Sequence, residues 1–125
     1  MIAADSSSII AFLQNNKGKD VLLIEEALKN SQLTLPPPVL AELLSDPKLP
    51  KQISKFIIEL PLLEMLPEFW ERAGKLRALI LSKKLKARLA DTLIAQFCID
   101  HHVSLITRDH DFQSFEQYTH LELLI

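Results

Sequence analysis

The stretch Leu105-Ile-Thr-Arg-Asp-His-Asp-Phe112 begins with apolar residues and ends in two acids that one residue separates. Residues 103–107 form a run too short for a helix and rich in aliphatic and β-branched side chains, which predicts a buried strand. Functional groups of open α/β sheets gather beyond the carboxyl ends of the strands. Asp109 and Asp111 are therefore candidates for a functional site at such an edge.

The rest of the chain alternates short apolar runs with longer segments of helical period. Strands are expected over residues 1–4, 33–35, 62–66, 103–107 and 120–125, and helices over 8–13, 20–30, 38–44, 52–60, 68–82 and 87–101. Ser6 or Ser7 is expected to cap the first helix. The run Pro36-Pro-Pro38 ends the second strand, because proline has no N–H for a sheet, and Pro38 suits a first helical turn. This alternation predicts a three-layer α/β/α sandwich around a mainly parallel sheet of about five strands.

Composition limits the class of protein. A chain of 125 residues with 48% hydrophobic side chains fits one compact domain over residues 1–125. The formal net charge of −2 argues against binding of nucleic acid by bulk positive charge, so any such contact must be local or mediated by a metal. The single cysteine, Cys98, lies in an apolar run and is expected to be buried in the core. With no signal-peptide pattern and no apolar run of about 18 residues, the expectation is a cytoplasmic protein with no membrane contact.

Four acids are expected to converge. Asp5 and Asp109 each follow a predicted strand and would share one edge of the sheet. Glu42 and Asp91 lie early in predicted helices, among aliphatic residues, where a plain solvated acid is uncommon. Two carboxylates about 4 Å apart repel by roughly 4 kcal/mol at an effective dielectric constant near 20, so a cluster needs protons or a cation. Oxygen ligands without His or Cys favour Mg²⁺ or Mn²⁺, which can activate water for phosphodiester hydrolysis.

At these residues the chain resembles a known family. The segments that carry the resemblance, in order along the whole chain, are Asp5-Ser-Ser7, Pro38-Val-Leu-Ala-Glu42, Arg88-Leu-Ala-Asp91-Thr-Leu-Ile-Ala95 and Leu105-Ile-Thr-Arg-Asp-His-Asp-Phe112. This ordered set is similar to that of PIN domains, and specifically of the VapC toxins of bacterial type II toxin–antitoxin pairs. The run of three prolines and the presence of only two glycines depart from the family pattern and bear on geometry rather than on the ligands.

The resemblance implies a Mg²⁺- or Mn²⁺-dependent endoribonuclease that cuts single-stranded RNA. It implies that Asp5, Glu42, Asp91 and Asp109 are the catalytic metal ligands. It assigns accessory roles to Asp111, Thr107 and Ser7. The hydroxyl of Thr107 or Ser7 would support the site. Lys86 and Arg88, just before Asp91, are candidates for contact with RNA phosphates. A small antitoxin protein that blocks the site, and a homodimer, are the implied partners, with the helix containing Phe69 and Trp70 as a candidate self-contact face.

Each assignment has a simpler structural alternative. Asp5 could be a helix cap, Glu42 and Asp91 could be favourable charges near helix N-termini, and Thr107 could be an ordinary strand residue. The segment containing Lys86 and Arg88 could be a solvated helix end. The four histidines show no zinc spacing, which favours surface or core roles for them.

Three other functions compete with the nuclease. A phosphoacceptor receiver domain needs an acceptor Asp after its third strand, where this chain has Leu66-Pro-Glu68. A haloacid-dehalogenase-type phosphatase needs a second Asp two residues after Asp5, where Ser7 stands. The remaining alternative is a non-catalytic PIN-fold module that binds RNA or protein.

Overall fold

The computed structural model describes residues 1–124 and places four parallel strands at the centre of the molecule. The strands are β1 (Ile2–Ala4), β2 (Leu33–Thr34), β3 (Ser104–Ile106) and β4 (Leu123–Leu124), in the order β2-β1-β3-β4. Ile2 pairs with Leu33 on one side and with Ser104 on the other, and Leu105 pairs with Leu123. The chain leaves β1 for one edge of the sheet and later extends from β3 to the other edge, so the strand order reverses between β1 and β3.

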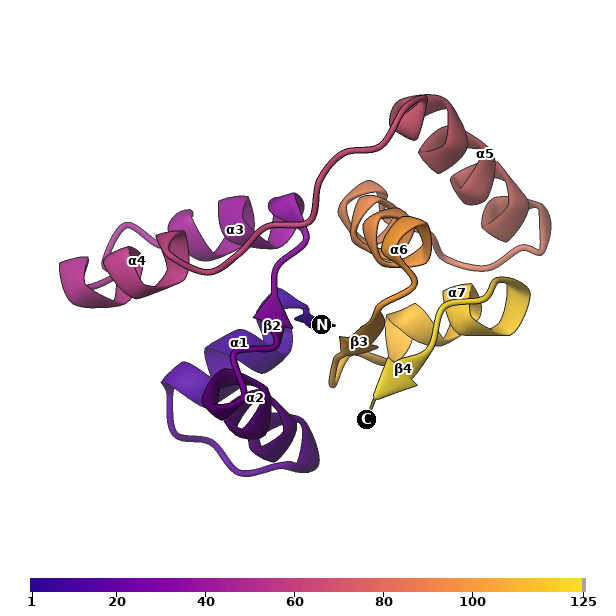
Figure 1. Cartoon of the computed structure of the whole chain (residues 1–125). Helices are drawn as coiled ribbons and strands as arrows, with labels where there is room; N and C mark the ends of the chain where they lie inside the picture. The colour runs from indigo at the N-terminus through magenta and orange to yellow at the C-terminus, as the bar shows by residue number, and fades with distance from the viewer. Residues whose placement is uncertain (125) are drawn as a thin grey trace.

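Within residues 1–124, seven α-helices surround these strands. They are α1 (Ser6–Leu13), α2 (Lys19–Lys29), α3 (Pro37–Leu44), α4 (Lys51–Ile58), α5 (Phe69–Ser82), α6 (Leu89–His101) and α7 (Gln113–Tyr118), with a 3₁₀ turn, η1 (His110–Phe112), before α7. As drawn in Figure 1, α1 and α2 lie at the lower left, next to β2, and α5 and α6 lie above the strands. Helix α2 contacts β2 and β3, and α6 contacts β3. The predicted three-layer sandwich around a parallel sheet is confirmed.

The core is aliphatic and aromatic. Ala3, Ala4, Leu105 and Ile106 are fully buried in β1 and β3, which explains why these strands lack the alternation of a half-exposed strand. Phe69 of α5 stacks on Phe97 of α6 with the ring centroids 4.3 Å apart. Cys98 is also buried, as predicted, and burial raises the pKa of its thiol. Among the residues described, no helix is long and apolar enough to cross a membrane.

Three local expectations are corrected. The expected strand over residues 62–66 is reduced to one parallel bridge between Leu35 and Leu62, so the described sheet has four strands rather than about five. Asp5, not Ser6 or Ser7, caps α1: its backbone is extended and its side chain accepts a hydrogen bond from the Ser8 N–H. Helix α7 was not predicted, because six residues provide too little helical periodicity. Of the expected final strand, residue 125 lies outside the described residues.

Candidate metal site at the carboxyl edge of the sheet

Asp5 lies at the point where the strand order reverses. Its backbone N–H donates to the Ile106 carbonyl at 3.1 Å, which extends the pairing of β1 with β3 by one residue. The Asp5 side chain is 3% exposed, and its two oxygens accept from three donors: the Ser7 hydroxyl, the Ser8 N–H and the Thr107 hydroxyl. Burial raises the pKa of this carboxyl, although the hydrogen bonds from Thr107, Ser7 and Ser8 oppose the rise. Asp5 is thus both a helix cap and a buried carboxylate at the sheet edge.

Thr107 connects Asp5 to the loop that follows β3. Its fully buried hydroxyl donates to Asp5 Oδ2 at 2.6 Å and accepts from the Asp109 N–H at 3.0 Å. Asp109 in turn caps η1, because its Oδ1 accepts from the Asp111 N–H at 2.9 Å. One chain of hydrogen bonds therefore fixes the path of the backbone from β3 to Asp111.

Asp91, Asp109 and Asp111 form a compact group of carboxylates. Each offers one oxygen, and these three oxygens all lie within 4.8 Å of one another. Asp91 comes from the first turn of α6, whereas the other two come from the loop after β3. The structure gives Asp111, which was expected only as an accessory residue, a place in the group equal to that of Asp109. Asp5 lies outside this group but adjoins it through Thr107.

The electrostatics of the group favour a cation. The pKa of Asp91 is raised to about 6, first by burial and then by repulsion from Asp109, with smaller contributions from Glu42 and Asp111 and an opposing effect of Arg88. Ionisation of Asp91 therefore costs more free energy than that of an ordinary aspartate, and a bound cation offsets this cost. Three carboxylates at this spacing suit a hard divalent ion that prefers oxygen ligands. The donor set fits such an ion.

Glu42 lies apart from the compact group. It is exposed on α3, and its Oε1 accepts from the Ser6 hydroxyl at 2.7 Å. The Glu42 charge still contributes to the raised pKa of Asp91. Ser6, which was not singled out from the sequence as a site residue, therefore orients Glu42, the predicted ligand on α3.

The two basic candidates differ in their surroundings. Lys86 Nζ lies 3.2 Å from Asp111 Oδ2, and both side chains are partly exposed. Arg88 is exposed at the N-cap of α6, and its charge opposes the rise in the pKa of Asp91. The structure thus places Lys86 at the edge of the acidic group and Arg88 near Asp91.

Arg108 and Asp20 form an ion pair that sequence reasoning missed. Arg108 Nε donates to Asp20 Oδ2 at 2.8 Å and Arg108 Nη2 donates to Asp20 Oδ1 at 3.0 Å, so the pairing is bidentate. Asp20 is 5% exposed and also accepts from the Ser8 hydroxyl, and its pKa is lowered to about 2, chiefly by the hydrogen bond from Arg108. Because Arg108 lies between Thr107 and Asp109, the pair anchors the acidic loop to α2. In the sequence, the only signals for this ion pair were an acid at the start of a helix and an arginine between two site residues.

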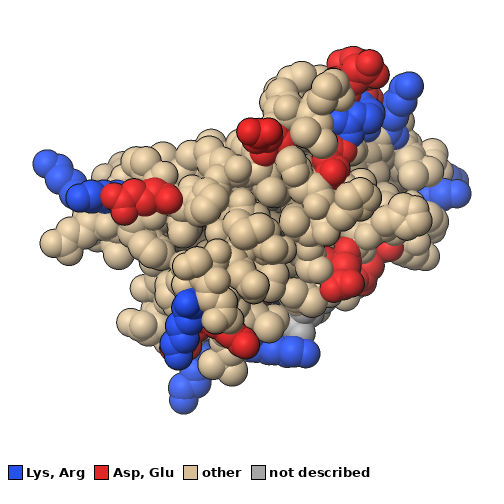
Figure 2. Space-filling view, in the orientation of Figure 1, with Lys and Arg blue, Asp and Glu red and all other residues tan. Residues whose placement is uncertain are grey.

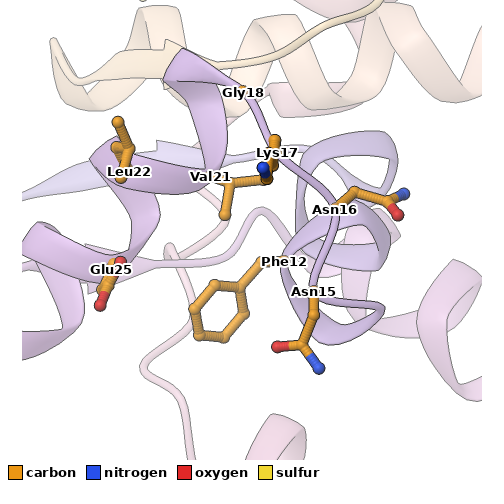
Figure 3. Close-up of a pocket in the computed structure, with 8 residues that line it drawn as sticks. All are labelled: Phe12, Asn15, Asn16, Lys17, Gly18, Val21, Leu22 and Glu25. Carbon is orange, nitrogen blue, oxygen red and sulfur yellow. The ribbon is translucent and has the colours of Figure 1, made fainter.

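Gly18 leaves room for this ion pair. A Cβ atom at residue 18 would lie 2.5 Å from Asp20 Oδ1 and 2.9 Å from Arg108 Nη2, and the φ angle is +156°. Glycine is the residue that accepts both the conformation and the close approach. The loop containing Gly18 also borders a hollow of about 470 Å³ between α1 and α2. Figure 3 shows the Phe12 ring facing this hollow, to which the site acids contribute nothing.

We expect Thr107→Val to lower the free energy of unfolding by about 2 kcal/mol, because valine has nearly the same shape but leaves Asp5 Oδ2 and the Asp109 N–H without their partner. Urea unfolding measures the change. Thr34→Val is the matched control, since Thr34 is also a buried strand threonine but donates to a neutral carbonyl, that of Pro61. Equal losses in the two variants would contradict a special role for the Thr107 hydroxyl.

One face of the molecule carries few charged side chains (Figure 2). Figure 2 shows basic and acidic side chains in small separate groups on a mostly uncharged face. With 14 basic and 16 acidic residues in the chain, an anionic polymer would be held by a few local contacts rather than by a broad basic surface.

The chain and its fold match known proteins. Residues 2–117 match the PIN domain family. A chain of the Rickettsia felis VapBC2 complex, solved with a DNA fragment from its promoter, has a TM-score of 0.75 and 23% identity, with 99% of this chain and 98% of that chain covered. A chain of the DNA-bound VapBC complex of Salmonella typhimurium has a TM-score of 0.72 and 19% identity, with 99% and 98% covered. FitAcB from Neisseria gonorrhoeae has a TM-score of 0.72 and 17% identity, with 100% and 97% covered. No curated protein is similar enough in sequence to count as a match.

Proposed function

Because this chain belongs to the PIN domain family, we propose that it is a Mg²⁺- or Mn²⁺-dependent endoribonuclease that cuts single-stranded RNA. The observation that carries the proposal is the group formed by Asp91, Asp109 and Asp111, with three carboxylate oxygens within 4.8 Å of one another. Neither a helix cap nor a solvated helix end requires three acids from two separate elements to converge. A hydrolase that uses a metal ion to cleave phosphodiesters does use such a group.

The residues divide into ligands and supports. Asp91, Asp109 and Asp111 would hold the ion, and Asp5 and Glu42 would complete its surroundings. When bound, the ion would neutralise these carboxylates and activate water for attack on the phosphodiester. Thr107 and Ser7 orient Asp5 through the hydrogen bonds they donate to its two oxygens. Lys86 provides a positive charge beside Asp111 that an RNA phosphate could share.

We also propose that a small antitoxin protein inhibits this chain in the cytoplasm. The solved VapBC structures are of toxin–antitoxin systems, and one such complex comes from Mycobacterium tuberculosis. In this chain a hollow of about 410 Å³ lies between α1, α3 and α4, with Ile10, Leu13 and Ile53 among its apolar residues and Glu42 and Asp46 among its acids. This combination suits an amphipathic segment with a basic residue that reaches Glu42. The segment would then lie beside the metal site.

A homodimer is the expected assembly. Helix α5 buries Phe69 but leaves Trp70 59% exposed, and Leu79 and Leu81 of the same helix are also exposed. Exposed large aromatic and aliphatic side chains on one helix are typical of protein interfaces. Sedimentation over a range of concentrations tests this proposal, and a monomer at every concentration would exclude it.

The function is tested by incubating the purified chain with a mixed pool of single-stranded RNA. We expect cleavage with Mg²⁺ or Mn²⁺, no cleavage in EDTA, and a rise in melting temperature on addition of Mn²⁺, because a ligand that binds only the folded state stabilises it. A co-expressed small protein from the same operon should inhibit the cleavage if it is the antitoxin.

Three outcomes separate the alternatives. Cleavage that resists EDTA would contradict a metal-dependent mechanism. Stabilisation by Mn²⁺ without cleavage of any RNA would favour the non-catalytic module. If Mn²⁺ does not stabilise the protein and no RNA is cleaved, the metal-site assignment itself is wrong.

A further inference from the structure

We propose that a hollow beside the metal acids binds one nucleobase of the RNA and sets the base preference of the cut. The proposal rests on the nuclease function and names a substrate contact that it does not include. The hollow, of about 280 Å³, is here called the α7 hollow, and it is lined by Leu85, Lys86, His110, Asp111, Gln113, Ser114 and Gln117. Ligand pockets start at about 300 Å³, so this one is sized for a single ring system rather than for a longer segment.

The position of the α7 hollow links it to the chemistry. Asp111 belongs both to the lining and to the group of three carboxylates. Lys86 is likewise in the lining, and its ammonium contacts Asp111 Oδ2 at 3.2 Å. A phosphate at the acidic group would therefore belong to a nucleotide whose neighbour can place its base in the hollow. Lys86 lies where the backbone between the two would pass.

The lining has the composition of a pocket for a single-stranded base. Sequence-specific recognition of RNA stacks unpaired bases on planar side chains, histidine among them, and forms hydrogen bonds with their edges. His110 is exposed and provides a ring, and Leu85 provides an apolar contact. Gln113 and Gln117 are four residues apart on α7 and so lie on one face of the helix. Their amides carry donors and acceptors that can read a base edge.

Gln113 and Gln117 contribute little to the stability of the fold. Both are exposed, and the one side-chain hydrogen bond of Gln113 among the described residues joins its Nε2 to His110 Nδ1 at 3.4 Å. Replacing either residue therefore leaves the buried core and the three carboxylates untouched. A ligand role for them can be tested without unfolding the protein.

The test compares the wild type with the Gln113→Met/Gln117→Met double variant, and uses Gln52→Met, an exposed glutamine on α4, as the matched control. Cleavage of a randomised single-stranded RNA pool, followed by sequencing of the ends, gives the base preference at each position around the cut. We expect the wild type and Gln52→Met to share a preference next to the cut, and the double variant to lose it by about tenfold, as expected for the loss of one good base contact.

Binding gives a second readout that does not depend on activity. In the Asp91→Asn background, with the RNA shown by gel to stay intact, the affinity for ten-nucleotide oligo(A), oligo(C), oligo(G) and oligo(U) is measured by fluorescence anisotropy. The double glutamine variant should make the four affinities nearly equal. Lys86→Gln should weaken all four alike and reduce the salt dependence by about one unit of slope, as for a phosphate contact.

The outcomes distinguish the subsite from the nuclease. Cleavage whose base preference survives in the double variant would overturn the subsite and leave the nuclease standing. Base-dependent binding that the double variant abolishes, in a protein that cuts no RNA, would support the subsite and overturn the nuclease. Equal affinity of the parent protein for all four oligonucleotides would overturn the subsite whatever the cleavage result.

Discussion

Asp91→Asn should lower the rate of RNA cleavage by about 100-fold or more while the protein stays folded, because the asparagine oxygen is a weaker, uncharged ligand at the centre of the acidic group. The same change should raise stability at pH 7.5 without metal. The pKa of Asp91 is raised to about 6 in the folded protein, so the folded state binds a proton more tightly than the unfolded state does. Its charged form therefore costs stability as pH rises from about 4 through 6.

The size of this stability effect is roughly 1 to 2 kcal/mol, after discounting the shift for the partial exposure of Asp91. Unfolding in EDTA at pH 4 and pH 7.5 measures it, and Asp91→Asn should flatten the dependence. Mn²⁺ should stabilise the wild type but have little effect on the variant. Asp46→Asn, an exposed acid outside the group of three, is the control for the loss of a charge. Unchanged cleavage by Asp91→Asn would remove Asp91 from the site.

Arg108→Met should lower the free energy of unfolding by about 3 kcal/mol, because it leaves the buried Asp20 carboxylate without its cationic partner. For a chain of this length the melting temperature should fall by roughly 10 °C. The double variant Asp20→Asn/Arg108→Met should recover part of the loss, since it removes the unpaired charge as well. The exposed Lys75→Met on α5 serves as a control for the loss of a surface cation.

The pair also makes a prediction about acid. The pKa of Asp20 is lowered to about 2, so the pair contributes its full stability above about pH 4 and loses it as pH falls towards 2. The wild type should therefore lose stability between pH 4 and pH 2 more steeply than Arg108→Met does. Parallel curves would show that the Arg108 interaction contributes little to folding, as in many exposed ion pairs.

The elements of this fold that could be predicted are those with strong local signals. The buried run that contains Leu105 and Ile106 and the amphipathic period of α2 and α5 identified strands and helices within a few residues. The region around Leu62 reads as a strand because it is apolar, yet its residues make one bridge only, since strand formation depends on a partner that the local sequence does not specify. Helix α7 is too short for its period to be recognised.

The candidate site was predictable in its acids but not in its supports. Residues that follow strands must meet at one edge of a parallel sheet, which is why Asp5 and Asp109 could be placed together. Both Asp109 and Asp111 lie close to Asp91, and this depends on the turn of η1, which the hydrogen bond from the Asp111 N–H to Asp109 sets. The partnership of Arg108 with Asp20 joins residues 88 apart along the chain and leaves no periodic signal.

The hydrogen bond between Thr107 and Asp5 has a consequence for how the protein is made. The two residues are 102 positions apart, so Asp5 leaves the ribosome long before its partner has been synthesised. During that interval α6 can form, but the carboxylates of Asp109 and Asp111 that complete the acidic group are absent. If the chain is the nuclease proposed above, a nascent or prematurely terminated product that lacks the loop after β3 should cleave no RNA.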